Sequence, residues 1–321
     1  MYEDIRSVIA TDFDAVNQYI IEQLHSQVPL VENIGHYLVE AGGKRMRPVL
    51  VLLSARACRI TDERHVKLAT VIEFIHTATL LHDDVVDMST MRRGRPTANS
   101  QWNNPSSVLV GDFIYSRAFQ ILVSLGDMRI MEIIADTTNK IAEGEVQQLL
   151  NKHNVEISEA DYLQVIRDKT AILFQAAAQC AAILAGADSA VETALKNFGM
   201  HVGKAFQLID DVLDYVGDAS DMGKNVGDDL AEGKPTLPII YAMSHSSETD
   251  ARLIRNSLKT NGIESLDKII AIVRKSGALD YTRQLADQEA NAARQCLSAL
   301  PDSEFKQALL AMAELAVNRV S

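Results

Sequence analysis

Apolar residues recur at spacings of three and four along almost the whole chain, and this regularity limits what the chain can fold into. Val16, Tyr19, Ile20 and Leu24 follow it near the start. This spacing places side chains on one face of a helix, whereas the alternation typical of strands is hard to find. The sequence therefore predicts an all-α fold with about ten or more helices and essentially no sheet.

The length and composition favour one large domain. The chain has 321 residues, 47% of them hydrophobic, which is ample for a large core. A length of this order also allows two domains. No segment rich in Pro, Ser or Gly divides the chain near its middle, so we expect a single domain over residues 1–321.

The net charge of the chain indicates which kinds of molecule it can bind. A net charge of −12 makes the chain repel nucleic acid and anionic membrane surfaces, so we expect no nucleic-acid partner. An anionic substrate would need local Lys and Arg side chains, or bound cations, to reverse the sign of the field.

The cysteines and the apolar segments indicate a cytoplasmic protein. Three widely spaced cysteines suggest neither a disulfide framework nor a zinc site, and they fit a reducing compartment. The acidic N-terminal segment has no continuous apolar run of the kind found in signal peptides. The most apolar stretch, 171–187, is Ala-rich and interrupted by Gln175 and Gln179, so we expect an internal helix and no transmembrane segment.

One acidic motif occurs twice. HDDVVD occupies 82–87 and IDDVLD occupies 209–214, and each ends a strongly apolar helix. The carboxylates are those of Asp83, Asp84 and Asp87 in the first cluster and Asp210, Asp211 and Asp214 in the second. The first and third Asp of each cluster share a helix face, whereas the second is rotated by about 100°.

These clusters predict a divalent-cation site. Three carboxylates on one helical turn repel each other and lose solvation beside apolar neighbours. Mg²⁺ removes both penalties, because it binds through a few carboxylates plus phosphate oxygens, whereas Ca²⁺ more usually takes loop carbonyls as well. One such cluster is as easily a solvated acidic turn, but two copies make coincidence a poor explanation. Facing each other, they would form a cation-lined mouth for a diphosphate.

Basic residues also cluster in this acidic chain. GGKRMRP, at 42–48, places three cations in four positions, and MRRG, at 91–94, follows the first Asp cluster. Lys169, Lys224 and Lys234 come later. Arg gives bidentate phosphate contacts and Lys a point charge. Surface solubility explains isolated Lys residues but not GGKRMRP, in which Gly lets the backbone approach a ligand.

Further candidates lie near the clusters. His76 lies two helical turns before the first cluster and Gln207 one turn before the second, so both face the side of their clusters. A lone His in such a place is more often a core residue. We expect two loops, at 91–107 and 217–238, and the second is the candidate active-site lid because it is long and dense in Gly, Asp and Lys.

Together, these motifs resemble one known family. The segments are GGKRMRP, IEFIHTATLLHDDVVDMSTMRRGRPTAN, VLVGDFIYSRAFQ, AEGEVQQL, the Lys169–Thr170 pair, FQLIDDVLDY and GKNVGDDLAEGKPTLP. In order and spacing they are similar to those of the trans-polyprenyl diphosphate synthases, and they cover most of the chain from Gly42 to Pro238. The resemblance implies a single helical bundle of the isoprenoid synthase type around a deep apolar cavity, with a homodimer as the expected assembly.

The resemblance also implies an activity and a set of site residues. The activity is Mg²⁺-dependent condensation of isopentenyl diphosphate with an allylic diphosphate, farnesyl or similar. The implied metal ligands are Asp83, Asp87 and Asp210, supported by Asp84, Asp211 and Asp214. The residues implied to bind isopentenyl diphosphate are Lys44, Arg47, His76 and Arg93. Those implied to hold the allylic diphosphate are Arg92, Lys169, Thr170, Gln207, Lys224 and Lys234. Lys169 and Lys224 are counted with the six aspartates as catalytic.

In such an enzyme, cavity depth sets product length. Ala78 and Thr79 are small, whereas short-chain relatives carry a bulky aromatic residue about one turn before the first cluster. Helix geometry turns Ala78 away from the Asp face, so its role is carried over from the family. The favoured product is octaprenyl diphosphate for a quinone side chain, destined for the membrane. Heptaprenyl and nonaprenyl products, and geranyl, farnesyl or geranylgeranyl starters, stay open.

Two other classes of protein fit part of the pattern. A terpene cyclase also uses an Asp-rich motif in an all-α fold, but it binds one diphosphate and has no use for GGKRMRP and His76. An inactive subunit of a heteromeric synthase would be expected to lose aspartates from a cluster, and this chain keeps all six.

Overall fold

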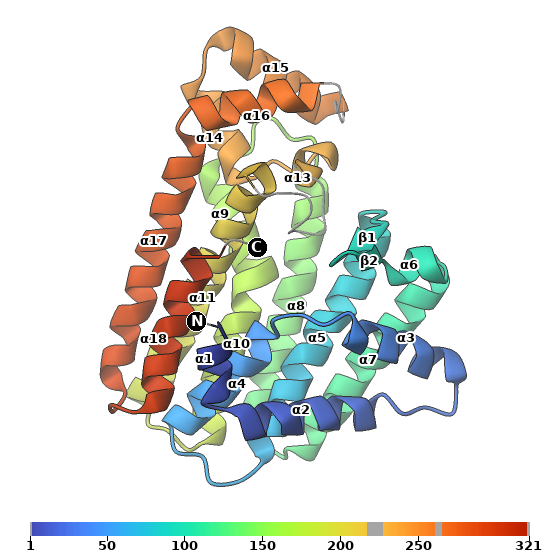
Figure 1. Cartoon of the computed structure of the whole chain (residues 1–321), viewed down its shortest axis with the longest axis vertical. Coiled ribbons are helices and arrows are strands. Elements are labelled where there is room, and N and C mark those ends of the chain that lie inside the picture. Colours follow the sequence, from blue (N-terminus) through green and yellow to red (C-terminus); the bar gives the residue numbers. More distant parts are fainter. Residues whose placement is uncertain (1, 217–226, 261–264, 320–321) are drawn as a thin grey trace. The chain divides into compact units, whose positions relative to one another are not determined.

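The computed structural model describes residues 2–216, 227–260 and 265–319, and nearly all of its elements are helices (Figure 1). The first helices are α1 (Tyr2–Ser7), α2 (Ala10–Gln23), α3 (Pro29–Glu40), α4 (Met46–Ala57), α5 (Arg64–Val86), α6 (Ala98–Gln101), α7 (Asn104–Ser124) and α8 (Met128–Asn151). They are followed by α9 (Glu159–Ile166), the π-helix η1 (Arg167–Ala171), α10 (Ile172–Leu184), α11 (Ser189–Val216), α13 (Asp228–Ala231) and α14 (Leu237–His245). The last are α15 (Glu248–Thr260), α16 (Leu266–Lys275), α17 (Ala278–Cys296), the 3₁₀ turn η3 (Leu297–Ala299) and α18 (Glu304–Val317).

The strands are minimal. Among the described residues, β1 (Met91–Arg92) and β2 (Arg95–Pro96) form the one sheet, an antiparallel pair with Met91 opposite Pro96. The predicted all-α class is confirmed. No helix in the described ranges combines the length and the apolar character that a membrane span requires.

The chain divides into two compact units, and each is described by itself. Unit 1 consists of Met1–Thr138, Leu173–Gly199 and Cys296–Met312, and unit 2 consists of Asn139–Ile172, Met200–Gln295 and Ala313–Ser321. The boundaries fall inside α8, α10, α11, α17 and α18. The first Asp cluster belongs to unit 1 and the second to unit 2. One domain over residues 1–321 stays a prediction.

The core of unit 1 places the first Asp cluster at a helix end. α5 packs along α7 and against α4 and α2, and α5 and α7 run side by side in Figure 1. In α4, every residue from Val49 to Leu53 is completely buried, as expected for a helix that is apolar all round. α5 ends at Val86, and Asp87 caps it with a backbone N–H to the Asp83 carbonyl at 2.8 Å.

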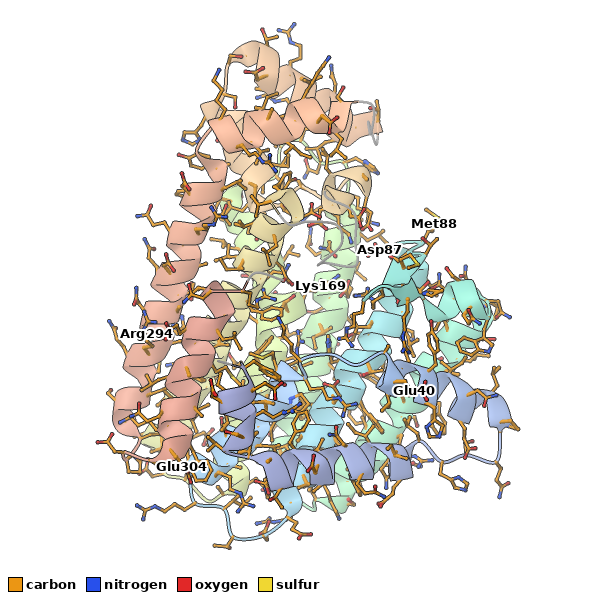
Figure 2. All side chains as sticks on the ribbon, in the orientation of Figure 1. Glu40, Asp87, Met88, Lys169, Arg294 and Glu304 are labelled. Carbon is orange, nitrogen blue, oxygen red and sulfur yellow. The ribbon has the colours of Figure 1, made fainter. Side chains whose placement is uncertain are left out.

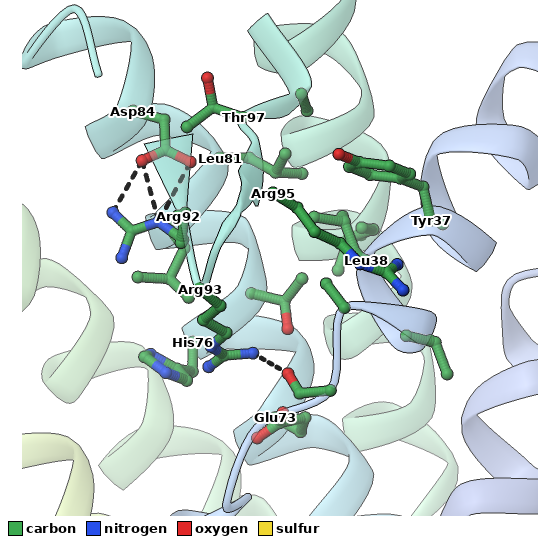
Figure 3. A pocket seen from close by; sticks show the side chains of 18 of the residues that line it. Tyr37, Leu38, Glu73, His76, Leu81, Asp84, Arg92, Arg93, Arg95 and Thr97 are labelled. Carbon is green, nitrogen blue, oxygen red and sulfur yellow. Dashed lines mark hydrogen bonds and ion pairs between the residues drawn. The ribbon is translucent and has the colours of Figure 1, made fainter. Parts of the chain in front are cut away.

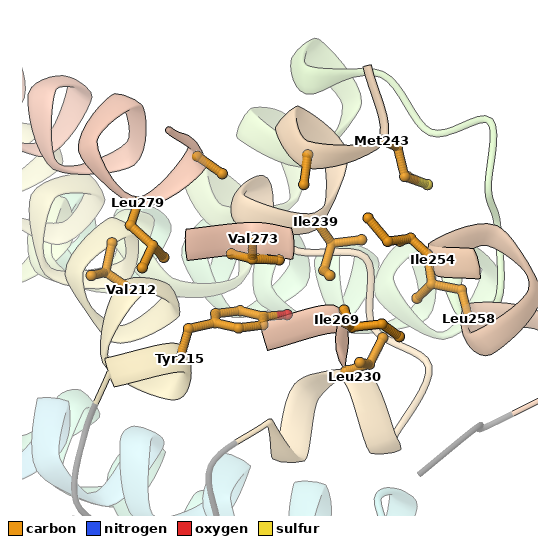
Figure 4. Packing of buried hydrophobic residues seen from close by; sticks show 12 residues of the cluster. Val212, Tyr215, Leu230, Ile239, Met243, Ile254, Leu258, Ile269, Val273 and Leu279 are labelled. Carbon is orange, nitrogen blue, oxygen red and sulfur yellow. The ribbon is translucent and has the colours of Figure 1, made fainter. Parts of the chain in front are cut away.

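The core of unit 2 holds the second cluster in the same way. Val212 and Tyr215 of α11 pack into a buried group with Ile254 and Val273 (Figure 4). On other sides of α11, Leu208, Ile209 and Leu213 join a second buried group, together with Tyr162 and Ile166 of α9. Apolar contacts thus surround the turn that carries the Asp motif and fix its orientation.

A π turn interrupts the helix that leads to the Ala-rich segment. α9 begins with a capping box, in which Ser158 Oγ accepts from Asp161 N at 3.1 Å and Asp161 Oδ2 accepts from Ser158 N at 3.3 Å. After Ile166 the backbone widens into η1 before α10 begins. Such π turns often occur at functional sites, and this one contains Lys169 and Thr170.

The two predicted loops differ from the expectation. Residues 91–107 hold the β1–β2 hairpin, α6 and the start of α7. Asn103 caps α7 by accepting from Ser106 N at 2.8 Å, and Pro105 fits the first turn. Of the second loop, residues 217–226 lie outside the described residues, and the remainder contains α13 and the start of α14.

Candidate functional site

The three aspartates of the first cluster have different surroundings. Asp84 is only 4% exposed, and Arg92 of β1 binds it through Nη2 to Oδ1 at 2.7 Å and Nε to Oδ2 at 3.2 Å. Asp83 and Asp87 are half-buried, and Figure 2 shows Asp87 at the end of α5. The middle carboxylate is therefore neutralised inside the fold, while the two that share a helix face reach solvent.

A basic pocket lies in unit 1 between α5, the β1–β2 hairpin and the segment before α4 (Figure 3). Its lining includes Arg45, Glu73, His76, Arg92 and Arg93. Burial raises the pKa of Glu73, although Arg45 lies close enough to oppose the shift. Burial also lowers the pKa of Arg93. Cationic side chains thus dominate a pocket in a chain whose net charge is −12.

The structure explains why GGKRMRP begins with two glycines. Gly43 has φ +148°, and a Cβ there would lie 2.6 Å from Arg93 Nη1. Arg93 Nη1 donates to the Gly42 carbonyl (Figure 3). Arg45 and Arg93 both adopt left-handed backbone, with φ 43° and 52°. Strained backbone of this kind tends to occur at functional sites, and here it lets a guanidinium lie directly on the loop.

His76 and Arg47 meet in the same pocket region. Arg47 Nη1 lies 3.2 Å from His76 Nε2, and the Arg47 guanidinium lies 4.4 Å from the centre of the Phe174 ring. Burial, followed by the charges of Arg47 and Arg93, holds the pKa of His76 well below its usual value. The imidazole is therefore neutral, accepts from Arg47 through Nε2, and carries its proton on Nδ1.

The second cluster departs from the symmetry of its motif. The Asp210 side chain is 43% exposed and pairs with Arg319 Nη2 at 2.7 Å. Asp211 and Asp214 are buried, at 2% and 8% exposure. The Asp214 carbonyl accepts from Gly227 N at 2.8 Å. Asp214 was expected to point the same way as Asp210, and the structure buries it while Asp210 stays partly exposed.

A hydrogen-bonded chain runs from the second cluster to the π turn. The Tyr162 hydroxyl donates to Asp211 Oδ2. Gln207 Nε2 donates to Asp211 Oδ1 at 2.9 Å. The Thr170 hydroxyl donates to Gln207 Oε1 at 3.0 Å. Burial, and then nearby acidic charge, raises the pKa of Asp211 and of Tyr162.

Lys169 is held by residues of α8. Its Nζ lies 2.7 Å from Glu145 Oε2 and 2.6 Å from Gln148 Oε1, and Figure 2 marks its place. A Cβ on Gly144 would lie 2.9 Å from the backbone nitrogen of Lys169. The AEGEVQQL motif therefore lets α8 approach the π turn closely and supplies two oxygen partners for the ammonium group.

The remaining predicted residues are placed as follows. Lys234 Nζ pairs with Glu232 Oε2 at 2.5 Å. Lys44 accepts a hydrogen bond at its carbonyl from the Tyr2 hydroxyl. Ala78 is completely buried, and the Thr79 hydroxyl donates to the His76 carbonyl at 2.8 Å. Lys224 lies outside the described residues.

The structure thus assembles two groups of predicted residues, one in each unit. Unit 1 brings together Arg47, His76, Arg92 and Arg93 with the first cluster, and unit 2 brings together Lys169, Thr170 and Gln207 with the second. Sequence reasoning missed Glu73, Glu145, Gln148, Tyr162 and Arg319. A signal existed for Tyr162, which lies two helical turns before Lys169, and for Glu145 and Gln148, which belong to a recognised motif.

An all-α fold with two Asp-rich helix ends and a basic pocket defines a synthase of the isoprenoid class. Residues 28–275 match the polyprenyl synthetase family. The chain is 51% identical to an octaprenyl diphosphate synthase of Haemophilus influenzae over 99% of this chain and 97% of the relative. It is 50% identical to an all-trans-nonaprenyl-diphosphate synthase of Rhodobacter capsulatus over 99% of this chain and 98% of the relative.

The solved structures agree with this match. A polyprenyl synthase from Caulobacter crescentus, complexed with calcium and isoprenyl diphosphate, superposes with a TM-score of 0.97 and 40% identity over 100% of this chain and 98% of that one. The chain belongs to the polyprenyl synthetase family, and the resemblance found in the sequence is confirmed.

Proposed function

We propose that this chain is a Mg²⁺-dependent trans-prenyltransferase that condenses isopentenyl diphosphate with an allylic diphosphate into a long-chain all-trans product, octaprenyl diphosphate. The observation that carries the proposal is the pair of Asp clusters. Each has a middle carboxyl group that is buried and hydrogen-bonded inside the fold and a first carboxylate that reaches solvent. The chain that carries them is 51% identical to an octaprenyl diphosphate synthase.

The residues present fit a hard divalent cation. Asp84 and Asp211 are buried and hydrogen-bonded within their own units, so the ligands we assign are Asp83, Asp87 and Asp210. A few carboxylates completed by phosphate oxygens are the donor set that Mg²⁺ prefers. When bound, the metal would neutralise negative charge as it develops on the leaving diphosphate.

We assign the remaining predicted residues to two substrates. Lys44, Arg47, His76 and Arg93 bind isopentenyl diphosphate, for which the neutral His76 offers its Nδ1 proton. Arg92, Lys169, Thr170, Gln207, Lys224 and Lys234 hold the allylic diphosphate. Positioned guanidinium and ammonium groups favour the charge-separated transition state because they need no reorganisation as the C–O bond breaks.

The reaction then follows from the two bound substrates. The allylic C–O bond ionises, and the oxygen dipoles of Gln207 and Thr170 would stabilise the resulting allylic cation. The isopentenyl double bond attacks, which lengthens the chain by five carbons, and a proton leaves to the departing diphosphate. Water must be excluded because it would quench the cation. Ala78 and Thr79 leave room for the growing chain.

We further propose a cytoplasmic homodimer. Leu109 and Val123 of α7 are 66% and 65% exposed, and Met128 at the start of α8 is 77% exposed. Leu109 and Val123 lie fourteen residues apart, close to four turns, so they share one helix face. An exposed apolar face of this kind is suited to a self-complementary contact with a second copy. The three free cysteines suit a reducing compartment.

Product analysis tests the activity. The purified chain, incubated with farnesyl diphosphate, isopentenyl diphosphate and Mg²⁺, should give a dominant C40 product by chromatography. An endpoint at C15 or C20 would overturn the assigned product class. Release of a hydrocarbon from the allylic diphosphate alone would indicate a terpene cyclase, and an inert single chain would indicate a subunit of a heteromeric synthase.

The metal assignment has its own test. Asp83→Ala should abolish turnover, because it removes one of the two carboxylates that we assign to the cation in the first cluster. The circular dichroism spectrum should stay that of the wild type, since Asp83 is half-buried and not part of the core. Near-normal turnover of the folded variant would refute the assignment.

A further inference from the structure

We infer that Tyr162 is a positioning residue for the allylic site, which fixes Asp211 and, through it, the direction of the Gln207 amide beside Thr170. This inference rests on the proposed function, because only there are Gln207 and Thr170 assigned to the allylic substrate. Tyr162 is buried, with only 4% of the residue exposed, so its hydroxyl does not contact the substrate.

Asp211 accepts hydrogen bonds on both of its oxygens. Tyr162, from α9, donates to Oδ2. Gln207, one turn earlier in α11, donates through Nε2 to Oδ1 at 2.9 Å. With the Tyr162 hydroxyl directed at Oδ2, Oδ1 is the acceptor that faces the Gln207 amide nitrogen.

This acceptor decides which way the Gln207 amide points. With Nε2 directed at Asp211, Oε1 faces Thr170, whose hydroxyl donates to it at 3.0 Å. If the amide were reversed, Gln207 Oε1 would lie against Asp211 Oδ1, and two acceptors cannot form a hydrogen bond with each other. Asp211 therefore fixes the carbonyl dipole of Gln207 and, with it, the direction of the Thr170 hydroxyl in the π turn.

Tyr162 in turn holds Asp211 in place. Asp211 is 2% exposed, so water does not replace a lost donor, and an unsatisfied buried oxygen would draw the carboxylate towards another partner. The Tyr162 ring packs with Leu208 and Ile209 in the buried group of unit 2. Because the ring is held by apolar contacts, Tyr162→Phe removes the hydroxyl and keeps the packing.

The first experiment is steady-state kinetics of Tyr162→Phe in the full chain, with farnesyl diphosphate, isopentenyl diphosphate and Mg²⁺. We expect kcat to fall about tenfold while KM for isopentenyl diphosphate stays within about twofold. Tyr281→Phe is the matched control, because the Tyr281 hydroxyl donates to Glu159 at 2.9 Å in the same unit but outside this chain of bonds. The control should keep the wild-type kcat, and an equal loss in both variants would contradict the inference.

A double-mutant cycle separates a positioning role from a general structural one. If Tyr162 acts through Gln207, then Tyr162→Phe should cost nothing further in a Gln207→Leu background. Multiplied losses would contradict the inference and leave the proposed function standing. Full activity of Gln207→Leu would instead contradict the allylic assignment and the inference together. Should Tyr162→Phe fail to fold by circular dichroism, Asp211→Asn replaces it in the cycle with the same two outcomes.

Discussion

The His76 imidazole is neutral and lies close to several arginines. Burial and the neighbouring charges of Arg47 and Arg93 lower its pKa well below the ordinary value. In the unfolded chain His76 therefore binds a proton near pH 6.5, whereas in the folded chain it stays neutral at that pH. Because folding lowers the pKa of the His76 imidazole, the free energy of unfolding is highest above about pH 6.5 and decreases as the pH falls below it.

The pH dependence of unfolding tests this state of His76. His76→Gln should make the free energy of unfolding less dependent on pH between 7 and 5, by up to about 1.4 kcal/mol per pH unit below ~6.5. Urea unfolding at several pH values measures the slope. His36→Gln serves as the control, because His36 is an exposed residue of α3. Equal slopes in wild type and His76→Gln would show that the imidazole titrates normally.

At the scale of elements, the contact between α8 and the π turn depends on one glycine. A Cβ at Gly144 would lie 2.9 Å from Lys169 N and 3.1 Å from the Asp168 carbonyl carbon. Both are backbone atoms, so the turn itself must shift. A displacement of about 1 Å in a positioning element costs on the order of 100-fold in rate. Gly144→Ala should therefore lower kcat by that order without unfolding the chain.

A second glycine provides the comparison. Gly35 lies inside α3, and the three atoms nearest to a Cβ there would all belong to the Leu24 side chain, the first at 3.0 Å. Gly35→Ala should leave kcat unchanged, because a side chain shifts by a few tenths of an ångström more easily than backbone does, and Ala favours a helix. Kinetics and thermal unfolding of both variants measure the difference. A fully active Gly144→Ala would mean that the close approach does not hold Lys169.

Periodicity predicted the helices and the rotation of each middle aspartate away from its two neighbours, because both follow from the geometry of one helix. It did not predict the enclosure of Asp214, which depends on what packs around α11. It also missed the π turn and the hairpin at 91–96, since an inserted residue and a two-residue ladder leave no periodic signal. Residues that act through other elements, such as Tyr162, become visible only when those elements are packed.

At the scale of the whole molecule, the proposed function requires the chain to bind a magnesium diphosphate. A ligand that binds only the folded chain raises its stability, by about 2.7 kcal/mol at ~100 times its Kd. Inorganic pyrophosphate with Mg²⁺ should therefore raise the melting temperature, and a chelator should reverse the rise. This measurement reports binding without turnover.

Single-cluster variants show whether the two clusters act together. Asp83→Ala and Asp210→Ala each remove one carboxylate that we assign to the cation. Either variant should lose most of the rise in melting temperature caused by magnesium pyrophosphate, because fewer carboxylates remain to hold the metal. The double variant shows whether the two losses overlap or add. A full rise in Asp210→Ala would exclude that aspartate from the site and confine the ligand to unit 1.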